Sequence, residues 1–346
     1  MKIFNQSVTQ IGLDIGTTGV RMVELEFSKN ETKLLCNASQ TISTNVSESQ
    51  TVEDHQELIA TIKKLITDSG ATSRSAVISL PLSKTTSTLL KTSKKSDEEL
   101  KPLVKKQVEH FTSMPINQLA YDWITTDDSM PDNQIEILTV ACPISLAQKY
   151  TGLASKAGLK VIAVEPGGIS IARNLASVTK LGKVIVHLGA YSTDIVIVYK
   201  NTPRIMRSIP VGGETIVNEL TNEATIELGQ ARQLIASFGL SPGKLEGQLQ
   251  RIIKASIDKI IDEVKNTKLV FLNRYKDAVI EQIVVSGGSS QIPGLPSYIA
   301  NQISLPVEIG NSWVGISYDV ARQDKLLQES ASYCVAAGLA QRSVRF

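Results

Sequence analysis

The stretch Ile11-Gly-Leu-Asp-Ile-Gly-Thr-Thr-Gly-Val20 is followed directly by Arg21-Met-Val-Glu-Leu-Glu-Phe27. It predicts a strand that enters a Gly/Thr turn and returns as a second strand. One carboxylate, Asp14, precedes the turn. The turn itself holds three candidate phosphate contacts: Gly16, Thr17 and Thr18. Backbone N–H groups and hydroxyls can surround a phosphate, and glycine lets the backbone approach it closely. The same pattern is typical of an ordinary hairpin, so this stretch alone does not distinguish a phosphate-binding turn from a structural one.

A similar pattern recurs at Val184-Ile-Val-His-Leu-Gly-Ala-Tyr-Ser-Thr-Asp-Ile-Val-Ile-Val-Tyr199. His187 stands where Asp14 stands in the first stretch, an offset of 173 residues, which is half of the 346 in the chain. A repeat at half the length predicts two similar lobes with a cleft between them. The second turn adds three candidate phosphate contacts: Gly189, Ser192 and Thr193.

Two glycine pairs follow later strands, in Ser208-Ile-Pro-Val-Gly-Gly-Glu214 and in Glu281-Gln-Ile-Val-Val-Ser-Gly-Gly-Ser-Ser290. A junction of strand, Gly-Gly and helix lets a flat ligand approach the backbone at the carboxyl end of the strand. These junctions supply the remaining candidate nucleotide contacts: Gly212, Gly213, Glu214, Gly287, Gly288 and Ser289.

The composition excludes several classes of protein. The 36 basic and 34 acidic residues nearly balance, so no strong field toward nucleic acid is expected. Three cysteines, an odd number with no metal-site spacing, predict buried core residues rather than disulfides or zinc ligands. The N-terminus lacks the apolar core of a signal peptide, and no apolar run approaches the roughly 18 residues of a membrane span. We therefore expect a soluble, cytoplasmic protein of about two domains.

Hydrophobic periodicity predicts the other elements. Residues 84–96 are compatible with a loop or an exposed strand, and 127–133 with a polar loop. A capping box, with Ser96 as N-cap and Glu99 reaching back, predicts a helix start. Helices are expected at 51–69, 97–111, 145–157, 166–177, 225–238, 249–275 and 330–344, and strands at 33–40, 76–80, 120–125, 135–141 and 159–164. Residues 85–160 thus form a small inserted α/β module.

The order of these parts resembles the actin-like ATPase superfamily. It has a first phosphate hairpin at 14–20, a connecting helix at 166–177, a second hairpin at 187–194, an adenosine loop at 286–290 and a second connecting helix at 333–340. Within the superfamily the chain resembles the PilM family of type IV pilus assembly, and next the FtsA family of cell division. The PilM features are Val23-Glu-Leu25, Asp97-Glu-Glu-Leu100, Met114-Pro-Ile116, Tyr121-Asp122 and Ala157-Gly-Leu-Lys160. FtsA-like proteins usually continue beyond the point where this chain stops, into a membrane-targeting helix.

The resemblance implies an α/β, actin-like (ribonuclease H-like) fold of two lobes with a subdomain inserted in each. The implied first-lobe core is 1–84, 161–183 and 326–346, with 85–160 inserted; the second-lobe core is 184–215 and 280–325, with the helical 216–279 inserted. It also implies ATP and Mg²⁺ in the cleft, with Asp14 holding Mg²⁺ through water.

The resemblance further implies partners. A PilN-like inner-membrane protein would place its cytoplasmic N-terminal tail in a groove near the inserted module. Other pilus assembly components are expected as further partners, and self-association is compatible with the family. The expected location is therefore cytoplasmic, at the inner face of the membrane and held there by a protein partner.

The chain departs from the ATPase pattern at two places. His187 replaces the usual second aspartate, and an imidazole suits transition metals better than Mg²⁺. Arg232 and Ile235 replace a Glu and a Lys that relatives place near adenosine. We expect at most a weak ATPase with no assignable catalytic residue, and Asp194 facing away from the cleft. An FtsA-like polymerising ATPase stays as the alternative, and a sugar kinase lacks a catalytic aspartate that we can place.

The remaining candidates have ordinary explanations. His55 and His110 lie on predicted helices without metal-ligand spacing, so we expect them in solvent or facing a partner. Trp123 and Trp313 are expected as packing anchors, although either is placed to border a peptide groove.

Overall fold

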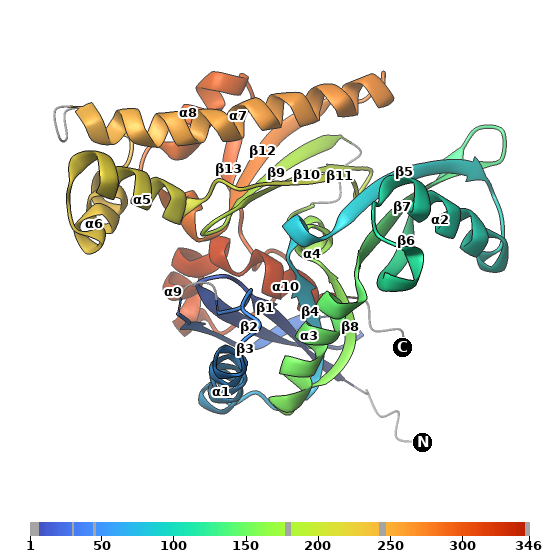
Figure 1. Ribbon diagram of the computed structural model, residues 1–346, viewed down its shortest axis with the longest axis horizontal. Coiled ribbons are helices and arrows are strands. Elements are labelled where there is room, and N and C mark those ends of the chain that lie inside the picture. Colours follow the sequence, from blue (N-terminus) through green and yellow to red (C-terminus); the bar gives the residue numbers. More distant parts are fainter. Residues whose placement is uncertain (1–6, 30, 44–45, 177–180, 242–246, 343–346) are drawn as a thin grey trace.

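A computed structural model describes residues 7–29, 31–43, 46–176, 181–241 and 247–342. It contains two five-stranded sheets and one three-stranded sheet, which Figure 1 shows in the lower, upper and right-hand parts of the view. The strands are β1 (Val8–Ile15), β2 (Gly19–Phe27), β3 (Thr32–Thr41), β4 (Ser75–Leu80), β5 (Thr86–Ser93), β6 (Leu119–Met130), β7 (Gln134–Pro143), β8 (Lys160–Pro166), β9 (Gly182–Leu188), β10 (Thr193–Tyr199), β11 (Thr202–Ile209), β12 (Ile280–Ser286) and β13 (Val307–Ile309). The helices are α1 (Val52–Asp68), α2 (Asp97–Phe111), α3 (Ile144–Lys156), α4 (Gly167–Leu175), α5 (Gly213–Ala224), α6 (Leu228–Phe238), α7 (Gln248–Arg274), α8 (Leu295–Ile303), α9 (Gln323–Glu329) and α10 (Cys334–Ala340).

The two large sheets have the same topology. Their strand orders are β3-β2-β1-β4-β8 and β11-β10-β9-β12-β13. In each, the first three strands are antiparallel and the last two join in parallel. This confirms the two lobes that the repeat predicts. We call the β3-β2-β1-β4-β8 sheet with its helices the first lobe, and the other sheet with α5–α8 the second lobe.

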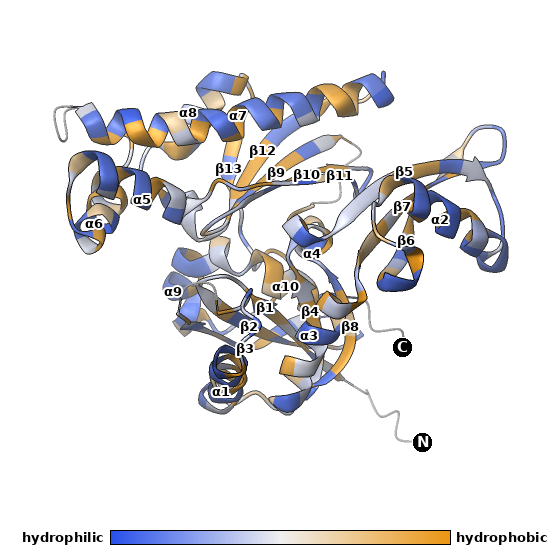
Figure 2. Cartoon of the chain, viewed as in Figure 1, coloured by the Kyte–Doolittle hydropathy of each residue, from blue (hydrophilic) through white to orange (hydrophobic). Residues whose placement is uncertain are grey.

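Helices cover the sheets because each carries one apolar face. In α7 the buried residues recur at helical spacing, Ile253, Ile257, Ile260 and Val264 among them, and Figure 2 shows the matching alternation of apolar and polar colour along this helix. The helices α4 and α10 lie against each other between the lobes. A Cβ atom on Gly338 of α10 would lie 2.0 Å from the carbonyl oxygen of Ser170 in α4, so this contact requires glycine.

A separate module is inserted between β4 and β8. We define the inserted module as β5, α2, β6 and β7, with the sheet order β5-β7-β6. The capping box of Ser96 and Glu99 begins α2, as predicted. The helix α3, which follows the module, packs through Tyr150, Leu153 and Ala154 into the core of the first lobe.

Several predicted boundaries move. Residues 86–93 form a strand, and β6 continues to Met130 where a polar loop was expected from 127. Helix α6 begins at Leu228, because Thr225 has a left-handed backbone (φ 50°) that ends α5. Helix α10 begins at Cys334 after a short 3₁₀ turn and ends at Ala340. The predicted ends of α4 at Ser177 and of α10 at Val344 lie outside the described residues.

Other features agree with the sequence or extend it. All three cysteines are buried and free. The segment around Trp313 packs with Tyr333 on the β2 and β3 side of the first lobe, although residues up to 325 were expected in the second. In the described part of the chain, no helix combines the length and the apolar character that crossing a membrane requires.

Candidate functional site

The cleft between the lobes holds a cavity of about 230 Å³. Most of the predicted contacts line it, and they come from both hairpin turns and from the β12 loop. These are Asp14, Gly16, Thr17, Thr18, Gly189, Ser192, Glu214, Gly287, Gly288 and Ser289. Elements more than 170 residues apart in sequence therefore meet around one space, as the repeat predicts.

The two turns are closed by the same hydrogen bond. The Gly16 N–H donates to the Gly19 carbonyl at 2.9 Å, and the Gly189 N–H donates to the Ser192 carbonyl at 2.9 Å. Within the described residues, the hydroxyls of Thr17 and Thr18 have no hydrogen-bond partner, and both side chains border the cavity. They are available to a ligand with acceptor oxygens, such as a phosphate.

Three predicted contacts do not line the cavity. Thr193 is fully buried, and its hydroxyl donates to the Val211 carbonyl at 2.6 Å. A Cβ on Gly212 would lie 2.4 Å from the Ala190 carbonyl oxygen, and one on Gly213 would lie 2.1 Å from the Ser289 hydroxyl. These glycines allow α5 to begin directly against the second turn, which is a packing role.

Asp14 and Arg21 lie opposite each other in the antiparallel register of β1 and β2, so both side chains point to the cleft. The Ser79 hydroxyl donates to Asp14 at 2.7 Å. Burial raises the pKa of Asp14, and both the Arg21 guanidinium and the Ser79 hydrogen bond work against that rise. In the described residues Arg21 forms no ion pair, so its charge is available to an anionic ligand.

His187 has the matching position in the second lobe. Its Nδ1 lies 3.0 Å from the Ser286 hydroxyl oxygen. Burial, and then the nearby Arg21 charge, lower the pKa of His187 to about 4. The ring is therefore neutral near pH 7 and offers the cleft a hydrogen-bonding nitrogen instead of a negative charge.

Asp194 faces the cleft, and the expectation that it faces away is wrong. It pairs directly with His187 in the register of β9 and β10, which places both side chains on the same face of the sheet. The Ser208 hydroxyl donates to Asp194 at 2.6 Å. The pKa of Asp194 is raised to about 6; burial is the largest cause, the Ser208 hydrogen bond works against the rise, and the Asp14 charge adds to it. The second lobe thus supplies a carboxylate from β10 in place of the one missing from β9.

The charged groups that α5 and α6 bring to this side of the cleft pair with each other. Arg232 of α6 forms a paired contact with Glu214 of α5, at 2.7 Å and 3.2 Å. Ile235 lies in the second-lobe core. The carboxylate of Glu214 is therefore neutralised by the protein itself.

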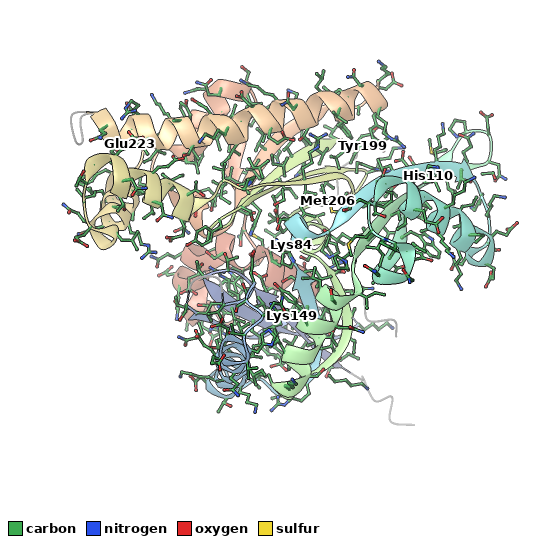
Figure 3. All side chains as sticks on the ribbon, in the orientation of Figure 1. Lys84, His110, Lys149, Tyr199, Met206 and Glu223 are labelled. Atoms are coloured by element: carbon green, nitrogen blue, oxygen red, sulfur yellow. The ribbon has the colours of Figure 1, made fainter. Side chains whose placement is uncertain are left out.

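Sequence reasoning missed several lining residues. Arg21 could have been found, because the hairpin register places it beside Asp14. Tyr150 lies on α3, and Glu48 lies in the segment before α1. No local sequence pattern predicts that either residue lines the cleft. The Lys149 ammonium (Figure 3) donates to the Ser47 carbonyl at 2.9 Å and so holds this segment at the cleft.

The carboxylates of the cleft can hold a magnesium ion only through water. Among the described residues, no group of three acids, histidines or cysteines lies close enough to hold a metal ion directly. Asp14 and Asp194 nevertheless approach the cavity from opposite lobes, and their mutual repulsion contributes to the raised pKa of Asp194. A divalent cation held through water would relieve that repulsion, and Mg²⁺ commonly binds in this way. The residues therefore fit Mg²⁺ held through water.

A second cavity, of about 620 Å³, lies between the inserted module and the first lobe. We call it the groove. Its apolar wall includes Ala120, Trp123 and Ile124 of β6, and its other wall includes Val164 of β8 and Ile169 of α4. Both β6 and β8 are edge strands of their sheets. An edge strand has unpaired backbone groups that can pair with an extended peptide.

One end of the groove carries a cluster of charges. The buried Glu165 accepts from Arg173 at 2.6 Å and 3.0 Å and from Arg342 at 2.8 Å. Trp123 thus borders the groove, whereas Trp313 is 2 % exposed and donates its indole N–H to the Leu326 carbonyl at 2.7 Å. Both tryptophans therefore anchor packing, since Trp123 packs against the core of the inserted module, and Trp123 also borders the groove.

Comparison with solved structures places this architecture among known folds. The chain is similar to a protein in a structure of the PilM-PilN type IV pilus biogenesis complex, with 20% identity, a TM-score of 0.84 and coverage of 98% of this chain and 99% of the other. It is similar to ethanolamine utilization protein EutJ from Carboxydothermus hydrogenoformans, with 14% identity, a TM-score of 0.59 and coverage of 97% and 90%. MreB5 of Spiroplasma citri, solved with AMPPNP, gives 14% identity, a TM-score of 0.51 and coverage of 95% and 94%.

These likenesses confirm the actin-like, two-lobed fold. The family model described as type IV pilus assembly protein PilM matches residues 12–344, which is nearly the whole chain. The chain therefore belongs to the PilM family of type IV pilus assembly proteins.

Proposed function

We propose that this protein is a cytoplasmic scaffold of type IV pilus assembly or a related secretion system. In this role it binds a nucleotide between its lobes and the cytoplasmic tail of a PilN-like inner-membrane protein in the groove. The observation that carries the proposal is the groove itself, present in a chain whose family and closely superimposable fold are those of PilM.

The groove suits a short apolar peptide. Ala120 and Ile124 offer apolar surface on one side, and the free edge of β8 offers backbone hydrogen bonds on the other. The tail of a membrane protein would hold the scaffold at the inner face of the membrane without any membrane-spanning helix of its own. Other assembly components would bind elsewhere on the surface.

The cleft suits a nucleotide with Mg²⁺. The turn residues Thr17 and Thr18 and the Arg21 guanidinium would bind phosphate oxygens. Asp14 and Asp194 would hold Mg²⁺ through water, and the ion would offset negative charge between phosphates and carboxylates. Hydrolysis would be slow at most, because a neutral His187 replaces the acid that relatives use to place the attacking water. Nucleotide would then act as a structural or switching ligand.

A calorimetric titration tests the partner. A peptide corresponding to the N-terminal tail of the matching PilN-like protein is titrated into the full chain, with and without Mg-ATP. Binding of one peptide per chain is expected, and the same residues in scrambled order serve as the control. Equal heats for both peptides, in either nucleotide state, would refute the partner.

A further inference from the structure

A buried ion cluster joins the inserted module to the second lobe. Glu136 of β7 accepts from Arg204 of β11 at 2.8 Å and from Arg274 at the end of α7 at 2.9 Å and 3.1 Å. The Tyr275 hydroxyl also donates to Glu136. We call Glu136, Arg204, Arg274 and Tyr275 the latch. Figure 1 shows the module at the end of α7 and beside β11.

The latch is built from both sides. The Glu136 side chain is 2 % exposed and the Arg204 side chain 0 %. Arg204 is held in place by its own lobe, because its guanidinium lies 5.8 Å from the Tyr199 ring centre and 5.7 Å from that of Tyr275. It also donates to the Thr126 carbonyl of the module at 2.7 Å. Separating the module from the second lobe would leave these buried charges unpaired, which is strongly destabilising. We therefore expect the contacts of the latch to break together or to stay intact.

Further contacts surround the latch. Lys200 pairs with Asp127 at 2.8 Å, and the Thr202 hydroxyl donates to the Thr126 carbonyl at 3.1 Å. Leu138 of the module shares a core cluster with Val196 and Met206 of the second lobe, and the same cluster includes Val77 and Ile171 of the first lobe. Tyr199 and Met206, labelled in Figure 3, lie on the side of the second lobe that faces the module. The module is therefore covalently part of the first lobe and has apolar contacts with both lobes, whereas its buried ion cluster is formed with the second lobe.

This arrangement links the two cavities. One wall of the groove is β6 of the module, and the other is β8 and α4 of the first lobe. The cleft is lined by both lobes, and Leu80, where the chain leaves β4 for the module, lines both cavities. If the module moves with the second lobe, any rotation of the lobes about the cleft also changes the width of the groove.

We propose that the latch makes the inserted module move with the second lobe, so that occupancy of the cleft controls peptide binding in the groove. The coupling is reciprocal, because a change in peptide affinity caused by nucleotide equals the change in nucleotide affinity caused by peptide. This inference rests on the proposed function, since it assigns the regulation of the same two sites.

The test uses Glu136→Gln, which keeps the size of the side chain but replaces one acceptor oxygen by an NH₂ group and leaves Arg204 and Arg274 without a counter-charge. The matched control is Glu263→Gln. Glu263 of α7 pairs with Arg207 of β11 at 2.6 Å, so it uses the same two elements inside the second lobe and does not touch the module. Arg274→Gln, which removes the partly exposed arm of the latch, is the milder variant should Glu136→Gln fail to fold.

The first measurement is hydrogen exchange of the full chain without ligand. Breaking the latch is expected to speed exchange in residues 119–143 and 193–209 together, while the strands β1 and β2 and the control variant remain unchanged. Unchanged exchange in both segments of a folded latch variant would overturn the proposal. This arm needs neither peptide nor nucleotide.

The second measurement is peptide affinity with and without Mg-ATP. In the natural chain and in Glu263→Gln, nucleotide is expected to change the peptide Kd by about 5- to 150-fold, the usual range of allosteric coupling. In the latch variants the ratio falls toward one while the peptide still binds. A ratio of one in the natural chain, or the same ratio in a folded latch variant, overturns the proposal. Absence of peptide binding in all forms would instead refute the proposed partner. The hydrogen-exchange measurement would still test whether the latch couples the module to the second lobe.

Discussion

The Ser286 hydroxyl lies 3.0 Å from Nδ1 of His187, which is the place in the second lobe that the Ser79 hydroxyl holds beside Asp14 in the first. Ser79 is the penultimate residue of β4 and Ser286 the last residue of β12, and each of these strands pairs in parallel with the central strand of its lobe. Both lobes thus have a serine hydroxyl at this place, but its hydrogen-bond partner is Asp14 in the first lobe and His187 in the second. One side of the cleft keeps a carboxylate on the central strand, and the other has a neutral ring.

Restoring an acid at this place should make the protein dependent on Mg²⁺. In His187→Asp a third carboxylate would join Asp14 and Asp194, and like charges in a partly buried site repel one another. We expect a lower midpoint of thermal unfolding in EDTA and recovery when Mg²⁺ is added, since an ion that binds only the folded state stabilises it. His187→Asn is the matched neutral control. An equal response of both variants to Mg²⁺ would contradict the prediction.

His187 and Asp194 should make opposite contributions to the pH dependence of stability. The pKa of Asp194 is raised from 3.8 to about 6, so its contribution is present at low pH and is lost as the pH rises to about 6. The pKa of His187 is lowered from 6.5 to about 4, so its contribution is present above 6.5 and is lost as the pH falls to about 4. In the natural chain the two nearly cancel.

Single variants should reveal each contribution. In His187→Gln the free energy of unfolding, relative to the natural chain, should fall as the pH rises from 4 to 6, with a slope approaching about 1.4 kcal/mol per pH unit. In Asp194→Asn it should rise over the same interval. Urea titrations at several pH values measure both, and His110→Gln on the exposed face of α2 is the control. Parallel pH profiles for all three variants would show that the two groups do not titrate as described.

Ile124 should anchor peptide binding in the groove, because its side chain lies on the face of β6 that meets the first lobe. Truncation to alanine removes apolar surface from the β6 wall, and the loss of such an anchor costs about 1 kcal/mol or more, roughly fivefold in Kd. Fluorescence anisotropy with a labelled tail peptide measures the change. Leu269→Ala removes an apolar side chain that is 60% exposed on α7 and does not line the groove, so it should leave the Kd unaltered. A loss below twofold for Ile124→Ala would place the peptide elsewhere.

Two glycine variants should have opposite effects on stability. A Cβ on Gly12 would lie 2.0 Å from the Ala336 carbonyl oxygen and 2.5 Å from the Ala340 nitrogen, so Gly12→Ala should destabilise by about 1–3 kcal/mol or more. A Cβ on Gly152, in the middle of α3, meets nothing within 4 Å, so Gly152→Ala should stabilise by about 0.5–1 kcal/mol. Urea denaturation compares the two. A loss of stability in Gly152→Ala as large as in Gly12→Ala would contradict the account of this packing.

Much of the fold could be predicted because its signals are local. The Gly/Thr turn after Asp14, the capping box at Ser96 and the apolar spacing of α7 each depend on neighbours in sequence, and the repeat of the hairpin supplied the two-lobed plan. The turn residues of the cleft followed from the same signals.

The rest depends on pairing over long distances. Asp194 was misplaced because alternation along one strand does not tell which face meets the cleft; the register against His187 does. Thr193, Gly212 and Gly213 were taken as ligand contacts because glycines and hydroxyls serve packing and binding alike. The latch residue Glu136 carries no motif at all, since its partners lie 68 and 138 residues away.

The contact of Gly12 with α10 has a consequence for how the chain is made. The first strand cannot complete its packing until a helix that ends at residue 340 is available, and chains emerge from the ribosome with the N-terminus first. The second lobe is built from one continuous stretch, so it can fold during synthesis. The first lobe has to wait, with its apolar strands exposed, until α10 has been synthesised, and chaperone binding to nascent chains should be strongest over residues 8–27.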